Sequence, residues 1–200
     1  MGARFFRSVL IPAAWGIFLF GLLAGVSGAA TRYRDLERAV EDEGYGASEI
    51  SQVARAYGAA LKAGQDRRDT IDLVKICIEG DFGSRQLVRV LMIYAQLELA
   101  ELPDEEFVSK VQEGVAKGIP AMKVLAAAER RALMLKSAEN ILNGLVLEGY
   151  DVDDRDREEL LPTVAEALES GKGEREVRKI LISSLEDGEN LRKIRRTLLR

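Results

Sequence analysis

The chain has 200 residues, of which 31% are charged and 47% are hydrophobic, and its formal net charge is −4. This composition excludes a disordered chain and a protein that crosses a membrane many times. The sequence contains no histidine and only one cysteine, Cys77, which excludes imidazole catalysis, imidazole metal ligation and internal disulfides. We therefore expect no cofactor. The acidic balance also argues against nucleic-acid binding, because phosphate recognition needs a clustered basic surface.

The first part of the chain has the pattern of an export signal. Residues 8–31 carry no charged side chain and follow a short segment with two arginines. A basic start, an apolar stretch and then small residues are typical of a secretory signal peptide. We expect cleavage after Ala29, with Ser27 at the −3 position, and Ala30 belongs to an alternative cleavage site.

The same segment also fits a membrane anchor, because an uncharged run of this length can span a bilayer as a helix. Residues 1–29 are therefore predicted to be either a signal peptide or an N-terminal anchor. Basic residues before the apolar run favour retention of that end inside the cell. Both interpretations place the remaining chain outside the cytoplasm, either in the periplasm or tethered to the inner membrane.

Residues 30–200 are predicted to form one all-α domain, because apolar residues recur at intervals of three and four. Three segments share apolar residues at positions i, i+1, i+4 and i+8, followed three residues later by Gly64, Gly118 or Gly171. These glycines are 54 and 53 residues apart. The apolar positions share one helix face, and the glycine suits the left-handed residue that ends a helix. The sequence thus predicts repeated helix–glycine–helix hairpins.

The hairpin units are expected near residues 47–80, 104–149 and 156–188. Their second helices, and one further helix, are expected at 67–79, 120–148, 174–187 and 84–101. Repeated hairpins that bury one face against their neighbours predict a short α-solenoid or an irregular helical bundle. The alternative is that amphipathic helices ending in glycine coincide without duplication.

Residues 151–159 form the densest carboxylate cluster of the sequence. They do not fit a calcium-binding EF-hand loop, because Asp156 stands where glycine is needed and Pro162 where glutamate is needed. We interpret the cluster as a solvated acidic loop before a helix, with weak cation binding as the alternative.

The C-terminal residues form a basic amphipathic segment whose apolar side chains Leu191, Ile194 and Leu198 share one face. One interpretation is contact with an anionic lipid surface or an acidic partner. The residues that would make this contact are Arg192, Lys193, Arg195, Arg196 and Arg200. The other interpretation is a terminal helix that docks its apolar face on the rest of the domain.

No catalytic motif accompanies these patterns. The sequence therefore predicts an exported, non-enzymatic protein of the bacterial envelope that has a structural role or binds another envelope protein. One alternative is a membrane-tethered accessory subunit of a larger complex, held through residues 8–31. A more distant alternative is an envelope hydrolase that uses only aspartate and glutamate side chains.

Overall fold

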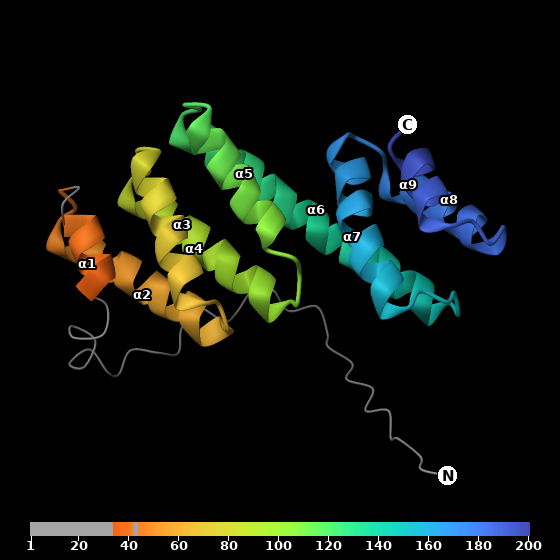
Figure 1. Ribbon diagram of the computed structural model, residues 1–200, viewed down its shortest axis with the longest axis horizontal. Coiled ribbons are helices and arrows are strands. Elements are labelled where there is room, and N and C mark those ends of the chain that lie inside the picture. Colours follow the sequence, from red (N-terminus) through yellow and green to blue (C-terminus); the bar gives the residue numbers. More distant parts are fainter. Residues whose placement is uncertain (1–33, 42–43) are drawn as a thin grey trace, which may run out of the picture. The chain divides into compact units, whose positions relative to one another are not determined.

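The computed structural model describes residues 34–41 and 44–200, and every regular element in these ranges is an α-helix (Figure 1). This confirms the predicted all-α class. The chain divides into two units, residues 1–34 and 35–200, and the second unit contains nearly all the described residues. The predicted signal or anchor, including Ser27, Ala29 and Ala30, lies outside the described residues. None of the helices described here has the length and apolar composition needed to cross a membrane.

The helices of the described ranges are joined by short turns. Their bounds are α1 Arg34–Glu41, α2 Ala47–Ala63, α3 Arg67–Glu79, α4 Ser84–Leu99, α5 Glu105–Ala116, α6 Ala121–Leu147, α7 Asp154–Glu169, α8 Glu174–Glu186 and α9 Leu191–Leu198.

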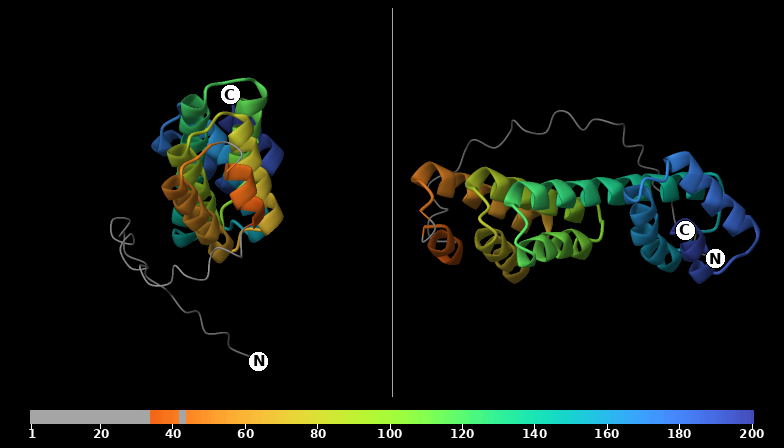
Figure 2. Two further views of the ribbon diagram at one scale, coloured as in Figure 1. Left: turned by 90° about the vertical axis from the view of Figure 1, so that its left-hand side faces the viewer. Right: turned by 90° about the horizontal axis from the view of Figure 1, so that it is seen from above.

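Alternate helices pack against one another in much of the unit. Helix α2 lies along α4, α4 contacts α6, α3 contacts α5, and α7 contacts α9 (Figures 1 and 2). By contrast, α2 and α3 pack less extensively against each other. Helix α6 has 27 residues, the most of any described helix, and contacts α4, α5, α7 and α8. It therefore supports the helices before it and those after it.

Between residues 44 and 118, residues with left-handed backbone conformation recur at a fixed interval. Gly44, Asp81 and Gly118 have φ values of 76°, 56° and 64° and follow one another by 37 residues. Gly64 and Glu101, with φ values of 125° and 54°, are also 37 residues apart. The interval agrees with the packing of alternate helices, because each 37-residue step carries the chain through two helices.

These turns share one hydrogen-bond pattern. The residue after the left-handed one donates its amide N–H to a carbonyl five residues earlier, as from Phe82 to Cys77 at 3.0 Å and from Ile119 to Gly114 at 3.0 Å. This is the Schellman arrangement, which satisfies carbonyl groups at the end of a helix. After Asp81 and Phe82, Gly83 is extended, with ψ of 162°, and opens α4.

The three glycines singled out in the sequence lie between helices. Gly64 joins α2 to α3, Gly118 joins α5 to α6, and Gly171, with φ of 103°, joins α7 to α8. Gly80 differs, because its φ is −89° and the left-handed residue is the neighbouring Asp81. A Cβ atom at Gly80 would lie 2.5 Å from Cγ2 of Val115, so its small size permits the approach of α5.

Candidate functional site

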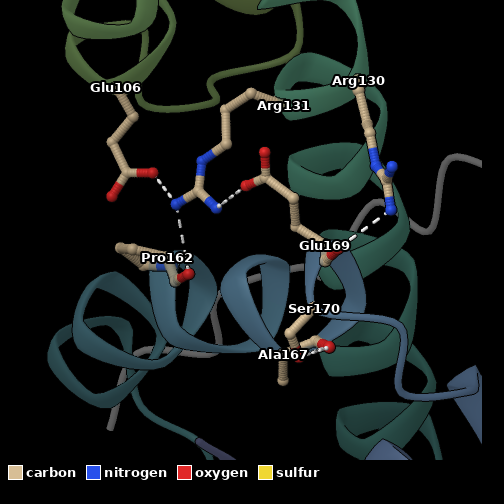
Figure 3. A network of polar contacts seen from close by, with 7 residues as sticks. All are labelled: Glu106, Arg130, Arg131, Pro162, Ala167, Glu169 and Ser170. Atoms are coloured by element: carbon tan, nitrogen blue, oxygen red, sulfur yellow. Dashed lines mark hydrogen bonds and ion pairs between the residues drawn. The ribbon is translucent and has the colours of Figure 1, made fainter. Parts of the chain in front are cut away.

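A buried arginine connects three helices near the middle of α6. Arg131 is 5% exposed, and its guanidinium donates hydrogen bonds to Glu106 of α5, to Glu169 Oε2 of α7 at 3.1 Å and to the Pro162 carbonyl at 3.3 Å (Figure 3). A buried charge is tolerated only when it is paired and hydrogen-bonded. These contacts therefore fix α5 and α7 on either side of α6.

The end of α7 is held by a second arginine of α6. Arg130 Nη2 donates to the Glu169 carbonyl at 2.9 Å, and the Ser170 hydroxyl donates to the Ala167 carbonyl at 2.7 Å (Figure 3). The last carbonyls of a helix lack partners within the helix and carry its negative dipole end. Arg130 thus satisfies a carbonyl group at a helix terminus, whereas Arg131 pairs with the carboxylates of two other helices.

A groove lies beside the Arg131 contacts. One hollow of about 450 Å³ is lined by α5 and α7, with Arg131 among its lining residues. Its other lining residues are Glu105, Glu106, Ser109, Lys110, Glu113, Glu166 and Glu169. A second hollow of about 460 Å³ shares Glu106 and Glu166 with the first and extends to α9. We refer to the two hollows together as the α5–α7–α9 groove.

Opposite charges line the part of the groove next to α9. Glu106, Glu159 and Glu166 contribute carboxylates, and Arg192 and Arg195 contribute guanidinium groups. Within the part of the chain that the structure describes, Glu166, Arg192 and Arg195 form no ion pair. The groove therefore offers charged groups of both signs to a bound molecule.

The basic C-terminal residues are divided between this groove and the surface. Helix α9 is docked by Ile194 and Leu198, which are 1% and 0% exposed. Their burial keeps these two apolar side chains within the domain, while the basic side chains remain accessible.

Two of these basic side chains line the groove, and the other three lie elsewhere on α9 and the C-terminus. Lys193 Nζ lies 2.5 Å from Glu189 Oε1, and this hydrogen bond raises the pKa of Lys193. Arg196 and Arg200 are exposed and do not line the groove. Contact between the predicted basic patch and an anionic surface therefore remains a prediction. Part of that patch lines the groove, and Lys193 is paired with Glu189.

The acidic segment at residues 151–159 serves to start α7. Asp153 caps the helix by accepting a hydrogen bond from the Asp156 amide at 2.7 Å. Desolvation and then the Asp153 charge raise the pKa of Asp156. Arg157 donates to Glu139 and Asn143 of α6.

In residues 34–41 and 44–200 no group of three or more Cys, Asp or Glu side chains is placed to hold a metal ion.

Cys77 is expected to resist alkylation in the folded protein. It is 0% exposed, and burial raises the pKa of its thiol to about 12. At pH 8 roughly one thiol in 10,000 is ionised at such a pKa, and the thiolate is the reactive form. Intact mass after iodoacetamide treatment at pH 8 should show unmodified protein. Rapid alkylation without denaturant, at the rate seen in urea, would contradict this expectation.

The sequence pattern did not indicate the Arg131 contacts. Arg131 falls among the apolar positions of α6, three residues after the buried Ala128 and four before the buried Leu135. A charged residue within an otherwise apolar helix stripe is the local signal that could have identified it. Its partners lie 25 and 38 residues away, so their identity could not be read from local spacing.

Comparison of the chain with models of known protein families, with curated proteins and with solved structures finds no match.

Proposed function

We propose that this chain is an exported, non-enzymatic interaction protein of the bacterial envelope. In this proposal residues 35–200 form a short α-solenoid that binds another envelope protein in the α5–α7–α9 groove. The observation that carries it is a groove lined by charged side chains of both signs and supported by the buried Arg131 contacts. A rigid base of this kind favours binding, because less conformational entropy is lost when the partner docks.

The recurrence of turns supports the solenoid part of the proposal. Left-handed residues at 37-residue intervals between residues 44 and 118, and the packing of alternate helices, are expected if a two-helix unit was duplicated. Helices α7, α8 and α9 begin 107 residues after α2, α3 and α4, respectively. In this proposal the single helix α6 takes the place of two shorter helices. It continues without a break through the position where the 37-residue interval would place a further turn.

The charges of the groove favour a protein segment over a small apolar ligand. Carboxylates of α5 and α7 would pair with basic side chains, and Arg192 and Arg195 with acidic ones. The facing carboxylates Glu106 and Glu169 are both engaged by Arg131, which makes them poorly suited to the paired-carboxylate hydrolysis considered above.

Site-specific photocrosslinking in cells tests this proposal. A photoreactive amino acid in place of Ser109, an exposed groove residue, should give a discrete crosslinked protein. The same probe in place of Ser183, which is exposed on α8, is the matched control. Glu166→Lys should remove the Ser109 product, whereas Glu174→Lys on α8 should leave it unchanged. Identical products from both probe sites, or none, would contradict binding in the groove.

The export part of the proposal has its own measurement. Intact mass and N-terminal sequencing of the protein from fractionated cells should show a soluble species that begins near residue 30. A membrane-fraction species that retains residues 1–29 would instead support the membrane-tethered accessory subunit. Full-length protein in the cytosolic fraction would contradict both forms of the proposal.

A further inference from the structure

The α5–α7–α9 groove continues into a third hollow at the start of α7. This hollow of about 540 Å³ is lined by the first turns of α7, by the end of α8 and by the first turn of α9. It shares Glu159, Leu191 and Arg192 with the neighbouring hollow of about 460 Å³. The three hollows are therefore continuous, and we refer to them together as the extended groove.

One side of α7 runs along the extended groove for most of the length of this helix. Its lining residues Asp156, Glu159, Thr163, Glu166 and Glu169 follow one another by three or four positions, so they lie on one side of the helix. From residue 156 to residue 169 this side is about 20 Å long. An extended segment of about six residues covers the same distance.

The extended groove has the shape that suits a narrow occupant. Arg131, which lines the hollow between α5 and α7, is 5% exposed, and its guanidinium is already bonded to Glu106 and Glu169 (Figure 3). Leu160, which lines the hollow beside α9, is 1% exposed. Linear protein segments bind grooves by placing single side chains in recesses of this kind.

Several charged groups of the extended groove are already paired within the domain. Besides the Arg131 contacts, these pairs are Glu113 with Lys117, Glu159 with Arg155, and Glu189 with Lys193. Each of these three pairs joins residues four positions apart in the sequence. Their carboxylates are less available to a partner than carboxylates that have no cation beside them.

The other charged lining residues form no ion pair with any described residue, and their signs differ between the two ends. They are Glu105, Lys110 and Glu166 toward α5, and Asp156, Arg192 and Arg195 toward α9. Toward α5, two carboxylates face one ammonium group, whereas toward α9 two guanidinium groups face one carboxylate. The unpaired charge is therefore negative near α5 and positive near α9.

We propose that the partner lays a linear segment along α7, with a basic side chain toward α5 and an acidic side chain toward α9. This inference rests on the proposed function, in which the groove binds another envelope protein. A lysine or arginine of the segment pairs with Glu105 and Glu166, and an aspartate or glutamate pairs with Arg192 and Arg195. An apolar side chain between them contacts Pro162, which lines the hollow beside α9.

Two short peptides of the same composition test this order of charges. Lys-Lys-Gly-Leu-Gly-Asp-Asp has ends of opposite charge, whereas Lys-Asp-Gly-Leu-Gly-Lys-Asp has no net charge at either end when both termini are blocked. Each is titrated at low salt, where charges are least screened, into the ¹⁵N-labelled full chain in mild detergent. Amide chemical shifts should show at least fivefold tighter binding of the first peptide. Equal affinities, or no shift changes at millimolar peptide, would overturn the proposal.

Charge reversal on α9 tests whether its arginines bind the acidic end of the peptide. Arg192→Glu combined with Arg195→Glu should abolish the difference between the two peptides. Arg175→Glu combined with Lys179→Glu, at exposed residues of α8 outside the extended groove, is the matched control and should preserve it. Far-ultraviolet circular dichroism checks that both variants are folded. A difference that persists in the α9 variant would overturn the proposal.

Crosslinking in cells separates failure of this inference from failure of the proposed function. Photoreactive probes at Ser109 and at Leu191 should mark the same segment of the partner, and mass spectrometry of the products locates both crosslinks. A basic residue should lie beside the Ser109 crosslink and an acidic residue beside the Leu191 crosslink. Separate segments, or the reverse order, would overturn this inference alone. Absence of a Ser109 product would contradict the proposed function, while the peptide preference would still confirm the order of charges.

Discussion

Arg131→Met is expected to lower the free energy of unfolding by about 3 kcal/mol, because it leaves the carboxylates of Glu106 and Glu169 without their shared partner. Removal of one member of a buried ion pair commonly costs about 3–5 kcal/mol, and the lower end applies here. The reason is that the Glu106 and Glu169 side chains are 33% and 24% exposed, so water can compensate part of the loss. Urea unfolding followed by circular dichroism gives the value.

The neighbouring arginine provides the control for this measurement. Arg130→Met removes one hydrogen bond from an exposed side chain to the Glu169 carbonyl and should cost about 1 kcal/mol or less. A double variant, Glu106→Gln with Arg131→Met, should be less destabilised than the sum of the two single changes. Equal losses at Arg130 and Arg131 would show that the buried contacts contribute little to stability.

Phe82→Ala is expected to lower the free energy of unfolding by about 3–4 kcal/mol. Phe82 is 2% exposed although it lies in the short turn between α3 and α4, and its aromatic ring fills part of the core. Deletion of a buried phenylalanine side chain costs about 3–5 kcal/mol, because apolar contact is lost and a cavity remains. Thermal and urea unfolding of the variant measure the loss.

The matched control lies at the same turn position 37 residues later. Ile119 follows Gly118 as Phe82 follows Asp81, but it is 38% exposed. Ile119→Ala should therefore cost about 1 kcal/mol or less, because little buried area is removed. If the two substitutions cost the same, the turn at Phe82 is no more tightly packed than the turn at Ile119.

The positions of the helices could be predicted from the sequence because their causes are local. Apolar spacing and terminal glycines predicted a helix at 67–79, and α3 spans Arg67–Glu79. The same signals predicted a long helix at 120–148, and α6 spans Ala121–Leu147. Helix ends defined by turns and caps depend on a few adjacent residues, so the sequence pattern contains the necessary information.

The 37-residue interval could not be found by following glycines. Asp81 and Glu101 have the same left-handed conformation as Gly44 and Gly64, so a search restricted to glycine passes over them. A search by glycine pairs α2 with α5, because Gly64 and Gly118 follow these two helices. In the structure, however, α2 packs against α4. The packing of α2 with α4 depends on contacts between segments that are distant in the sequence, so local spacing does not reveal it. Duplication of the two-helix unit remains a prediction.

For the groove, too, the sequence predicts local properties but not contacts between distant segments. The basic character of α9 can be predicted from its sequence, which is compatible both with a docked apolar face and with one that contacts a surface. The structure places Arg192 and Arg195 opposite carboxylates of α5 and α7, which depends on how three helices are assembled. No spacing rule connects Glu106 with Arg195, because they are brought together only after the helices have packed.

The continuity of α6 has a mechanical consequence. It packs against α4 and α5, which precede it in the chain, and against α7 and α8, which follow it. In a stack of separate repeats, a pull at one end passes through a series of interfaces, and the weakest of them yields first. Here the helices at both ends of the unit pack on one continuous helix, α6, which is about 40 Å long and has backbone hydrogen bonds in every turn. Tension between the two ends is therefore borne by α6, and the ends should unfold together.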